Sequence, residues 1–338
     1  MRLGLRPSWR RLGAVGLACC VALTACTGSA DSAPPASTGA PSAATSSTGP
    51  TSSMTPTPSP SASSASASPS PKRIELPRGG TTIFPKYRLV GYSGYPGAPA
   101  LGRLGVGDLD DRVKEMERRA KPYAKGRTVL PTLELITTVV HSSPGKDGMY
   151  RTRIDESIIK SHLAAARRHQ AILLLNIQPG RADFLDEVKA YEKWLSEPDV
   201  GLALDPEWAV GPGEVPGRVF GSTTGKELDS VASWVSALVA KHHLPEKVVV
   251  YHQLHVNIVE NEKRLTTHTG VVMIKSVDGI GSPGAKVDTW KVVIARKPKF
   301  VHPGFKLFYT EDRAGGNALM TPAQVMALKP TPEYILYE

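Results

Sequence analysis

The sequence predicts an α/β protein, with a single (β/α)₈ TIM-barrel-like domain over residues 73–338. Two observations predict this fold: eight strand-like apolar runs follow one another along the chain, and helical patterns separate them. The length of about 265 residues is also typical of such a barrel. Local patterns leave a doubly wound open sheet as the alternative. In a barrel, catalytic groups lie at the carboxyl ends of the strands, so the strand ends map the expected site.

The expected elements alternate in type. The strand-like runs are Arg88–Tyr92, Leu130–Thr137, Ala171–Ile177, Val200–Leu204, Lys247–His252, Gly270–Lys275, Gly304–Tyr309 and Tyr334–Tyr337. The helical patterns are Asp108–Ala124, Asp155–His169, Asp183–Leu195, Lys226–His243 and Pro283–Arg296, with shorter pieces at Val256–Lys263 and Pro322–Leu328. In the clearest helix, Leu228, Val231, Val235 and Leu238 recur at the spacing of one helical face.

The first 72 residues differ in composition from the rest. Residues 1–26 combine arginines, an apolar run and Leu23-Thr24-Ala25-Cys26, which resembles the lipobox of bacterial lipoproteins. This predicts cleavage before Cys26 and a lipid on its sulfur, which would anchor the protein to the outer face of the cell membrane. An ordinary signal peptide is the alternative. Residues 27–72 are rich in Ser, Thr, Pro and Ala, and they predict a disordered spacer.

The charge and cysteine content narrow the partners. The formal charge is +10, and removal of the four arginines of residues 1–26 leaves 37 basic and 31 acidic residues, or +6. This balance suits an anionic envelope surface, and we expect no nucleic-acid partner and a monomer. All three cysteines lie in residues 1–26, so the domain has no disulfide. A Gly279–Gly284 match to G-x-G-x-x-G lacks its distant acidic residue, and we expect no cofactor and no metal.

The most informative stretch is the fourth strand and its end. The apolar run Val200–Leu204 predicts a buried strand, and Asp205 and Glu207 follow it directly. Residues two apart project to the same side in extended structure, so the two carboxylates can address one point. Trp208 and a Gly/Pro-rich loop over residues 209–225 come next. Paired acids under a loop suit acid/base work on a sugar bond, and we take Asp205 and Glu207 as catalytic candidates.

Other strand ends supply further candidates. Glu134 lies within the apolar second strand, where a buried carboxylate needs a task or a partner, so it is either a third catalytic acid or part of a structural ion pair. Asp183 is expected to cap the following helix. His252 and His255 are three residues apart, but a metal site needs a third ligand. The expected substrate-binding residues are Tyr92, Tyr95, Asn176, Gln178, Trp208, His252, Gln253, Lys306 and Tyr309, of which the two tyrosines of the first turn also suit simple rim packing.

Asp205-Pro206-Glu207 resembles the D-x-E element of two groups of glycoside hydrolases, the family 25 lysozymes and the family 18 chitinase-like enzymes. The fuller family 18 pattern, D-x-x-D-x-D-x-E, has Val200 and Ala203 here in place of its first two acids. The resemblance implies that Glu207 protonates the leaving oxygen. It implies that Asp205 orients an acetamido group or stabilises the cationic transition state. The whole chain also resembles a group of uncharacterised actinobacterial lipoproteins, which implies an envelope location.

Two functions therefore stay open. The first is a membrane-tethered glycoside hydrolase that acts on cell-wall or related polysaccharide. The second is a non-catalytic barrel that binds envelope glycan or organises wall machinery, which the two missing acids favour. Metal-dependent deacylation through His252 and His255 is a further alternative. If the protein is an enzyme, we expect Asp205 and Glu207 to face an open cleft. If it is a binding protein, these carboxylates can instead form ion pairs.

Overall fold

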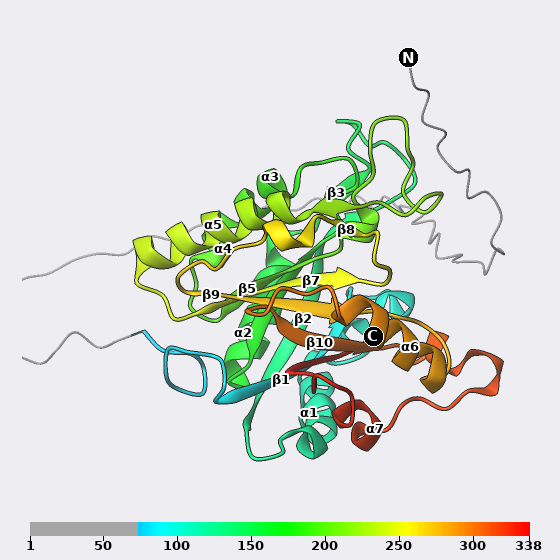
Figure 1. Cartoon of the computed structure of the whole chain (residues 1–338). Coiled ribbons are helices and arrows are strands. Elements are labelled where there is room, and N and C mark those ends of the chain that lie inside the picture. The colour runs from blue at the N-terminus through cyan, green and yellow to red at the C-terminus, as the bar shows by residue number, and fades with distance from the viewer. Residues whose placement is uncertain (1–73) are drawn as a thin grey trace, which may run out of the picture. The chain divides into compact units, whose positions relative to one another are not determined.

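The computed structural model describes residues 74–338, so the expected signal peptide, the lipidation site Cys26 and the spacer lie outside the described part. Eight parallel strands form the main sheet: β1 (Tyr87–Gly94), β2 (Thr128–Val140), β4 (Ile172–Ile177), β5 (Val200–Leu204), β7 (Lys247–Gln253), β9 (Val271–Val277), β10 (His302–Leu307) and β11 (Tyr334–Tyr337). Each strand pairs with the next, and β1 pairs with both β2 and β11. The sheet is therefore closed, which confirms the (β/α)₈ barrel and excludes the open sheet (Figure 1).

Helices surround the barrel, with α3 and α5 on one side and α1 and α7 on the opposite side (Figure 1). The α-helices are α1 (Leu109–Ala120), α2 (Glu156–Arg168), α3 (Phe184–Lys189), α4 (Glu192–Leu195), α5 (Gly225–His242), α6 (Pro283–Ile294) and α7 (Pro322–Met326). Short 3₁₀ helices are η1 (Pro99–Leu101), η2 (Arg103–Gly105), η3 (Lys121–Tyr123), η4 (Pro206–Trp208), η5 (Glu262–Arg264) and η6 (Glu311–Gly316). No helix among residues 74–338 is both long enough and apolar enough to span a membrane.

Polar side chains fix where the main helices begin. Asp108, Asp155 and Asp183 each precede a helix and accept hydrogen bonds from backbone N–H groups of its first turn. Thr224 and Ser282 do the same for α5 and α6. Such caps satisfy donors that the helix itself leaves unpaired. The expected cap at Asp183 is confirmed.

Two apolar cores stabilise the fold. The larger core lies between the strands and the helices, and it includes Tyr92, Leu133, Val235 and Trp290. The smaller core lies inside the barrel and is built from inward-facing residues such as Leu89, Leu130, Leu174, Ala203, Val250, Ile274 and Leu336. These alternate along each strand with residues of the larger core, as the two-residue period of a strand requires. The barrel interior is thus a packed core.

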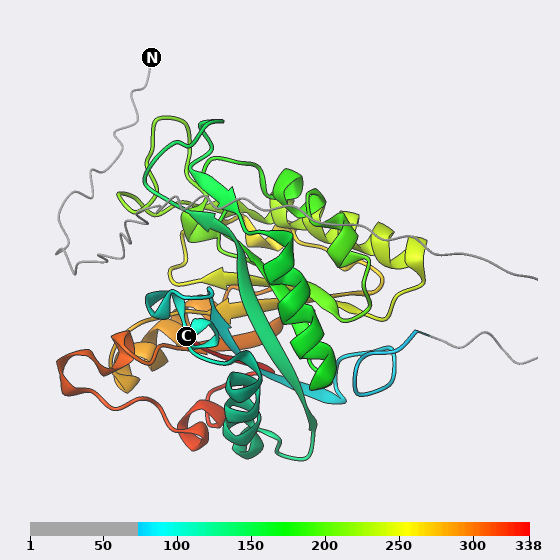
Figure 2. The same cartoon turned by 180° about the vertical axis from the view of Figure 1, so that it is seen from behind.

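Four features differ from the sequence-based prediction. The helix expected over Asp183–Leu195 is broken into α3 and α4, because Tyr191 leaves the helical geometry and its hydroxyl donates to Thr137 O at 2.7 Å. The region Val256–Lys263 contains only η5 and the strand β8 (Val259–Glu260), which pairs with β6 (Thr223–Thr224). Strand β10 ends two residues earlier than expected. Strand β3 (Arg151–Arg153) pairs antiparallel with the extended end of β2, beyond the barrel (Figure 2).

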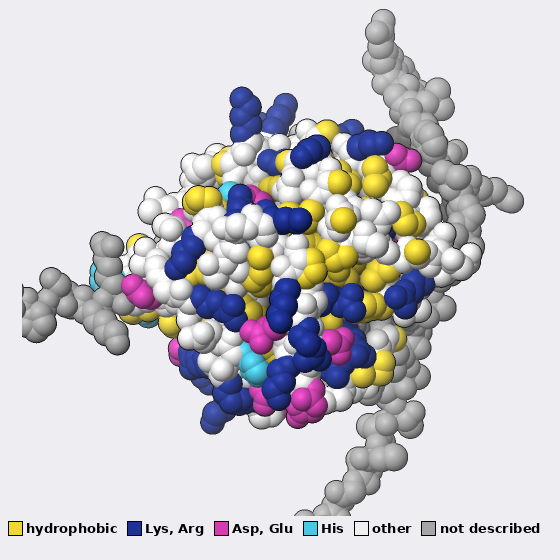
Figure 3. Space-filling model, turned by 90° about the horizontal axis from the view of Figure 1, so that it is seen from below, with side chains coloured by type: hydrophobic (Ala, Val, Ile, Leu, Met, Phe, Trp, Pro, Cys, Tyr) yellow, Lys and Arg dark blue, Asp and Glu magenta, His cyan; other side chains and the backbone are white. Residues whose placement is uncertain are grey.

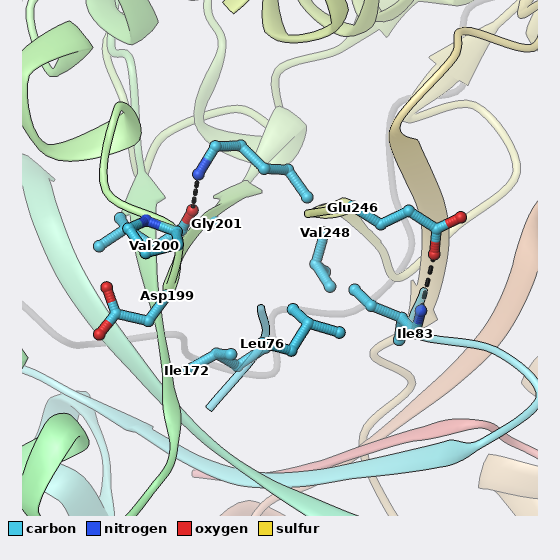
Figure 4. Close-up of a pocket in the computed structure, with 10 residues that line it drawn as sticks. Leu76, Ile83, Ile172, Asp199, Val200, Gly201, Glu246 and Val248 are labelled. Carbon is cyan, nitrogen blue, oxygen red and sulfur yellow. Dashed lines mark hydrogen bonds between the residues drawn. The ribbon is translucent and has the colours of Figure 1, made fainter. Parts of the chain in front are cut away.

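The amino end of the barrel is closed by the segment that precedes β1. Leu76 and Ile83 pack into the inner core there, and Ile83 N donates to Glu246 Oε2 at 2.7 Å. They line a cavity of about 10 Å³, which has room for about one water molecule (Figure 4). The buried Lys247 Nζ donates to Glu197 O at 2.7 Å and to Val200 O at 2.6 Å beside it. The polar network of the protein lies at the other end of the barrel.

Candidate active site

At the carboxyl end of the barrel the inward-facing residues change from apolar to polar. The last inward positions carry Ser93, Glu134, Asn176, Asp205, His252, Ser276, Lys306 and Glu338, one from each of the eight strands or its immediate continuation. All but Glu338 are buried. Because the strand ends converge, these side chains form one hydrogen-bonded network, which also includes Gln178 and Asp278. The barrel fold thus brings together polar residues that are spread over more than 240 positions of the sequence.

Asp205 is held by two amides, one on the neighbouring strand β4 and one directly after its end. Asn176 Nδ2 donates to Asp205 Oδ1 at 2.9 Å and to Glu134 Oε1 at 3.0 Å, and Gln178 Nε2 donates to Asp205 Oδ2 at 3.3 Å. Burial raises the pKa of Asp205, while His252 and Lys306 oppose that effect. Asn176 and Gln178, which the sequence suggested as substrate ligands, therefore orient a catalytic candidate in this structure.

His252 lies at the centre of the network. Its Nδ1 is 2.7 Å from Asp278 Oδ2, and its Nε2 is 3.1 Å from Glu134 Oε1 and 3.9 Å from Asp205 Oδ1. Burial lowers the pKa of the imidazole, but the charges of Asp278 and Glu134 outweigh burial and raise it well above the usual histidine value. His252 is thus an imidazolium that neutralises the buried acids around it. His255, in contrast, is exposed on the following loop.

Lys306 is the second buried cation. Its Nζ is 2.6 Å from Glu338 Oε2 and 3.4 Å from Asp278 Oδ2, and Ser93 Oγ donates to the same Glu338 oxygen at 3.0 Å. Burial opposes the charge, yet Glu338 and Asp278 raise the pKa of Lys306 well above its usual value. A lysine held as an ammonium is a counter-ion, because only the free amine is a nucleophile.

Glu134 completes the connections between strands. Tyr334 OH donates to Glu134 Oε2 at 2.5 Å, while Asn176 and His252 contact its other oxygen. Burial would raise the pKa of Glu134, but His252 together with the hydrogen bonds lowers it. Glu134 is therefore an ionised and fully partnered carboxylate. It takes part in a buried ion pair, which was one of the two interpretations that its sequence position allowed.

Glu207 differs from the other acids. It lies in η4, two residues beyond Asp205; the residue is partly exposed, but its Oε2 is buried without a hydrogen-bond partner among the described residues. Burial raises the pKa of Glu207 well above the usual value, and the nearby charges of Asp205 and Asp278 raise it further. The raised pKa favours the protonated carboxyl, and Glu207 is more exposed to solvent than Asp205.

The low pKa of Asp278 predicts acid sensitivity. Burial opposes ionisation, but His252 and Lys306 lower the pKa of Asp278 to about 2 in the folded protein. Between about pH 4 and pH 2 the unfolded chain therefore binds a proton that the folded chain does not, so stability falls as the pH falls. In the Asp278→Asn variant, the free energy of unfolding is expected to fall by about 2–3 kcal/mol less than in wild type over this pH range. Urea denaturation at several pH values measures it, and the exposed Asp288→Asn control should retain the wild-type slope.

The remaining candidates from the sequence lie outside the network. Tyr92 is buried in the outer core, where its hydroxyl donates to Glu115 Oε1 at 3.0 Å and lies 3.2 Å from Tyr309 OH. Tyr95 and Tyr309 are partly buried against the same core. Trp208 is partly exposed beside Glu207. Gln253 is buried, and its Nε2 donates to His255 O at 3.0 Å.

Several network residues were not among the predicted site residues, although Asp278 and Glu338 stand at strand ends that could line a cleft. They are Ser93, Ser276, Asp278, Tyr334 and Glu338. All but Tyr334 share one signal: a polar residue stands two positions after an inward-facing residue at a strand end, as Glu338 follows Leu336. Applied to every strand, the two-residue period identifies most of the network. The pairing of particular acids with particular bases requires the three-dimensional arrangement.

Comparisons with known proteins add little to this geometry. The chain matches no protein-family profile and no curated protein. Among solved structures it is similar to a hyperthermophilic endo-beta-1,4-glucanase in complex with substrate, with 11% sequence identity and a TM-score of 0.38. That match covers 74% of this chain and 87% of the glucanase chain. The closed ring of strand pairs defines the barrel independently of this similarity.

Proposed function

We propose that this protein is an extracytoplasmic glycoside hydrolase that cleaves cell-wall or related polysaccharide, with Glu207 as the general acid. The observation that carries the proposal is the position of Glu207: it follows the buried Asp205 at the end of β5, it is partly exposed, and its Oε2 has no hydrogen-bond partner among residues 74–338. Protonation of the glycosidic oxygen requires an acid that stays protonated near neutral pH. A buried carboxyl beside other carboxylates meets that requirement.

The neighbouring residues suit distinct supporting roles. The carboxyl of Asp205, held by Asn176 and Gln178, would stabilise the positive charge that develops on the sugar or orient its acetamido group, as the D-x-E resemblance implies. His252 and Lys306 fix the remaining acids, so that the electrostatic field around Glu207 is preorganised. Glu134 acts by holding His252 and Asn176 in place, which makes it a positioning residue in this proposal.

The location of the enzyme belongs to the same proposal. The Leu23-Thr24-Ala25-Cys26 sequence supports a lipid anchor at Cys26, and the Ser/Thr/Pro-rich residues 27–72 would then form a tether to the outer face of the membrane. A monomer on such a tether would reach wall glycan. Mass spectrometry of the membrane fraction tests the anchor, because a Cys26→Ala variant should lose both the diacyl mass and membrane retention.

A glycan-binding protein without catalysis is the second candidate. The observation in its favour is that Asp205 is only 5% exposed and that Glu134 is completely enclosed by its partners. Fully partnered acids stabilise a structure as readily as they catalyse a reaction. The substrate-facing surface would then consist of Glu207 and Trp208 with the loop that follows.

One experiment separates the two candidates. The protein is incubated with peptidoglycan and with N-acetylated and neutral oligosaccharides, and both the release of reducing ends and the retention on insoluble glycan are measured. Release of reducing ends from any substrate establishes hydrolysis. Retention without release assigns the binding function, and neither release nor retention contradicts both candidates.

A further inference from the structure

Two arginines bind one glutamate outside the barrel, and a third arginine lies one helical turn further along the chain. This arginine cluster consists of Arg103 on η2, Arg112 and Arg119 on α1, and the partly exposed Glu115 between them. Arg112, Glu115 and Arg119 are three and four residues apart, so they share one face of the helix. Arg103 follows the carboxyl end of β1, and the cluster therefore adjoins the rim of the barrel on the side that carries the candidate active site.

Glu115 is already saturated with donors. Its Oε1 accepts hydrogen bonds from Arg103 Nε at 3.0 Å and from Tyr92 OH at 3.0 Å. Its Oε2 accepts from Arg103 Nη2 at 2.8 Å and also from Arg112 Nη1. The hydrogen bond from Arg103 lowers the pKa of Glu115 despite partial burial, so the carboxylate stays ionised. Glu115 therefore compensates one of the three positive charges of the arginine cluster.

Arg119 has no carboxylate partner among the described residues and packs against tyrosines instead. Among residues 74–338 it forms no ion pair, and its Nε is buried without a hydrogen bond. Its guanidinium lies 5.3 Å from the ring centre of Tyr309 and 5.1 Å from that of Tyr337, and these two rings are stacked on each other. The rings hold the guanidinium in place by cation–π contact. The residue is partly exposed, so a ligand can approach it from solvent.

We propose that the arginine cluster binds an anionic group, either a carboxylate or a phosphate, carried by an envelope polysaccharide. The cluster holds three guanidinium groups and one carboxylate, and that carboxylate pairs with Arg103 and Arg112, so two positive charges have no counter-ion within the cluster. A guanidinium presents parallel N–H donors that match the oxygens of carboxylates and phosphates. Arg119 is held in place before any ligand arrives, which lowers the entropy lost on binding.

The surrounding surface favours the same class of ligand. The view from the side of α1 and α7 shows many Lys and Arg side chains with fewer Asp and Glu side chains between them (Figure 3). An excess of positive charge raises the local concentration of anions and steers them toward the surface. Apolar side chains lie at the centre of the same view and offer contact area for the body of a sugar chain (Figure 3).

The site is tested by titration of the full chain with inorganic phosphate and, separately, with a glucuronate disaccharide. Arg119→Gln is expected to weaken binding about tenfold or more, because it removes a charged donor. Arg119→Lys keeps the charge but loses the planar fork, and it should also bind more weakly than wild type. The matched control is Arg118→Gln on the exposed face of the same helix, which should bind as wild type does.

The source of the anion is distinguished with two polymers. Retention of the protein on a glycerol-phosphate polymer alone assigns a phosphodiester, and retention on a glucuronate polymer alone assigns a carboxylate. Binding that weakens with added NaCl supports charge recognition. The proposal is overturned if neither small anion binds, or if Arg118→Gln weakens binding as much as Arg119→Gln. Thermal unfolding of each variant shows whether a loss of binding reflects a loss of folding.

Discussion

Glu207→Gln is expected to lower the rate of glycan hydrolysis by about 10²–10⁴-fold, the usual contribution of a general acid. Glutamine has nearly the same shape as the neutral carboxylic acid but has no proton to transfer. The wild-type rate should also fall as the pH rises through the raised pKa of Glu207, because the ionised form cannot act as an acid. Initial rates of reducing-end release over a range of pH values measure both effects.

The same substitution should leave the folded structure intact. Because the pKa of Glu207 is higher in the folded chain than in the unfolded chain, the folded state holds a proton that the unfolded state releases above about pH 4.3. Wild-type stability therefore decreases as the pH rises through this window, and the glutamine variant avoids that loss. Glu214→Gln, an exposed change in the following loop, should keep full activity. Full activity in Glu207→Gln would instead exclude Glu207 as the acid.

Most of the barrel could be predicted from sequence because its strands are apolar on both faces. Val200–Leu204 coincides with β5, and the other seven strand predictions overlap the observed strands. The failures occurred where long-range contacts decide the local structure. Tyr191 breaks the helix between α3 and α4 through its hydrogen bond to the end of β2, which is distant in the sequence. The antiparallel strand β3 likewise depends on the extension of β2 beyond the barrel.

The site was less predictable than the fold, because chemistry depends on pairs of residues. The sequence pointed to Asp205, Glu207, Glu134 and His252, and the structure brings them together at one end of the barrel. It gave no indication that Asp278 would be the main partner of His252, since the two lie on different strands. Nor could it show that Tyr92 faces outward, because a strand pattern with apolar residues on both faces leaves the facing direction ambiguous.

His252→Ala is expected to lower the free energy of unfolding by about 3–5 kcal/mol, the cost of breaking a buried ion pair from one side. The substitution leaves Asp278 and Glu134 buried without their shared cation, and among residues 74–338 only Lys306 still forms an ion pair with Asp278. The matched control is His255→Ala, three residues further along and exposed, which should change stability by less than about 0.5 kcal/mol. Urea denaturation of wild type and both variants measures these changes in the free energy of unfolding, provided that the m-value is the same for all three proteins.

The pH dependence of this difference identifies its electrostatic origin. The folded pKa of His252 lies well above its unfolded value of about 6.5, so the imidazolium contributes its full stability below that value. As the pH rises through the folded pKa, the proton is lost and the contribution disappears. The difference in the free energy of unfolding between wild type and His252→Ala should therefore be largest near pH 6 and smaller at higher pH. If this difference stayed constant across the pH range, the loss of stability would come from the cavity left by the imidazole and not from the loss of its charge.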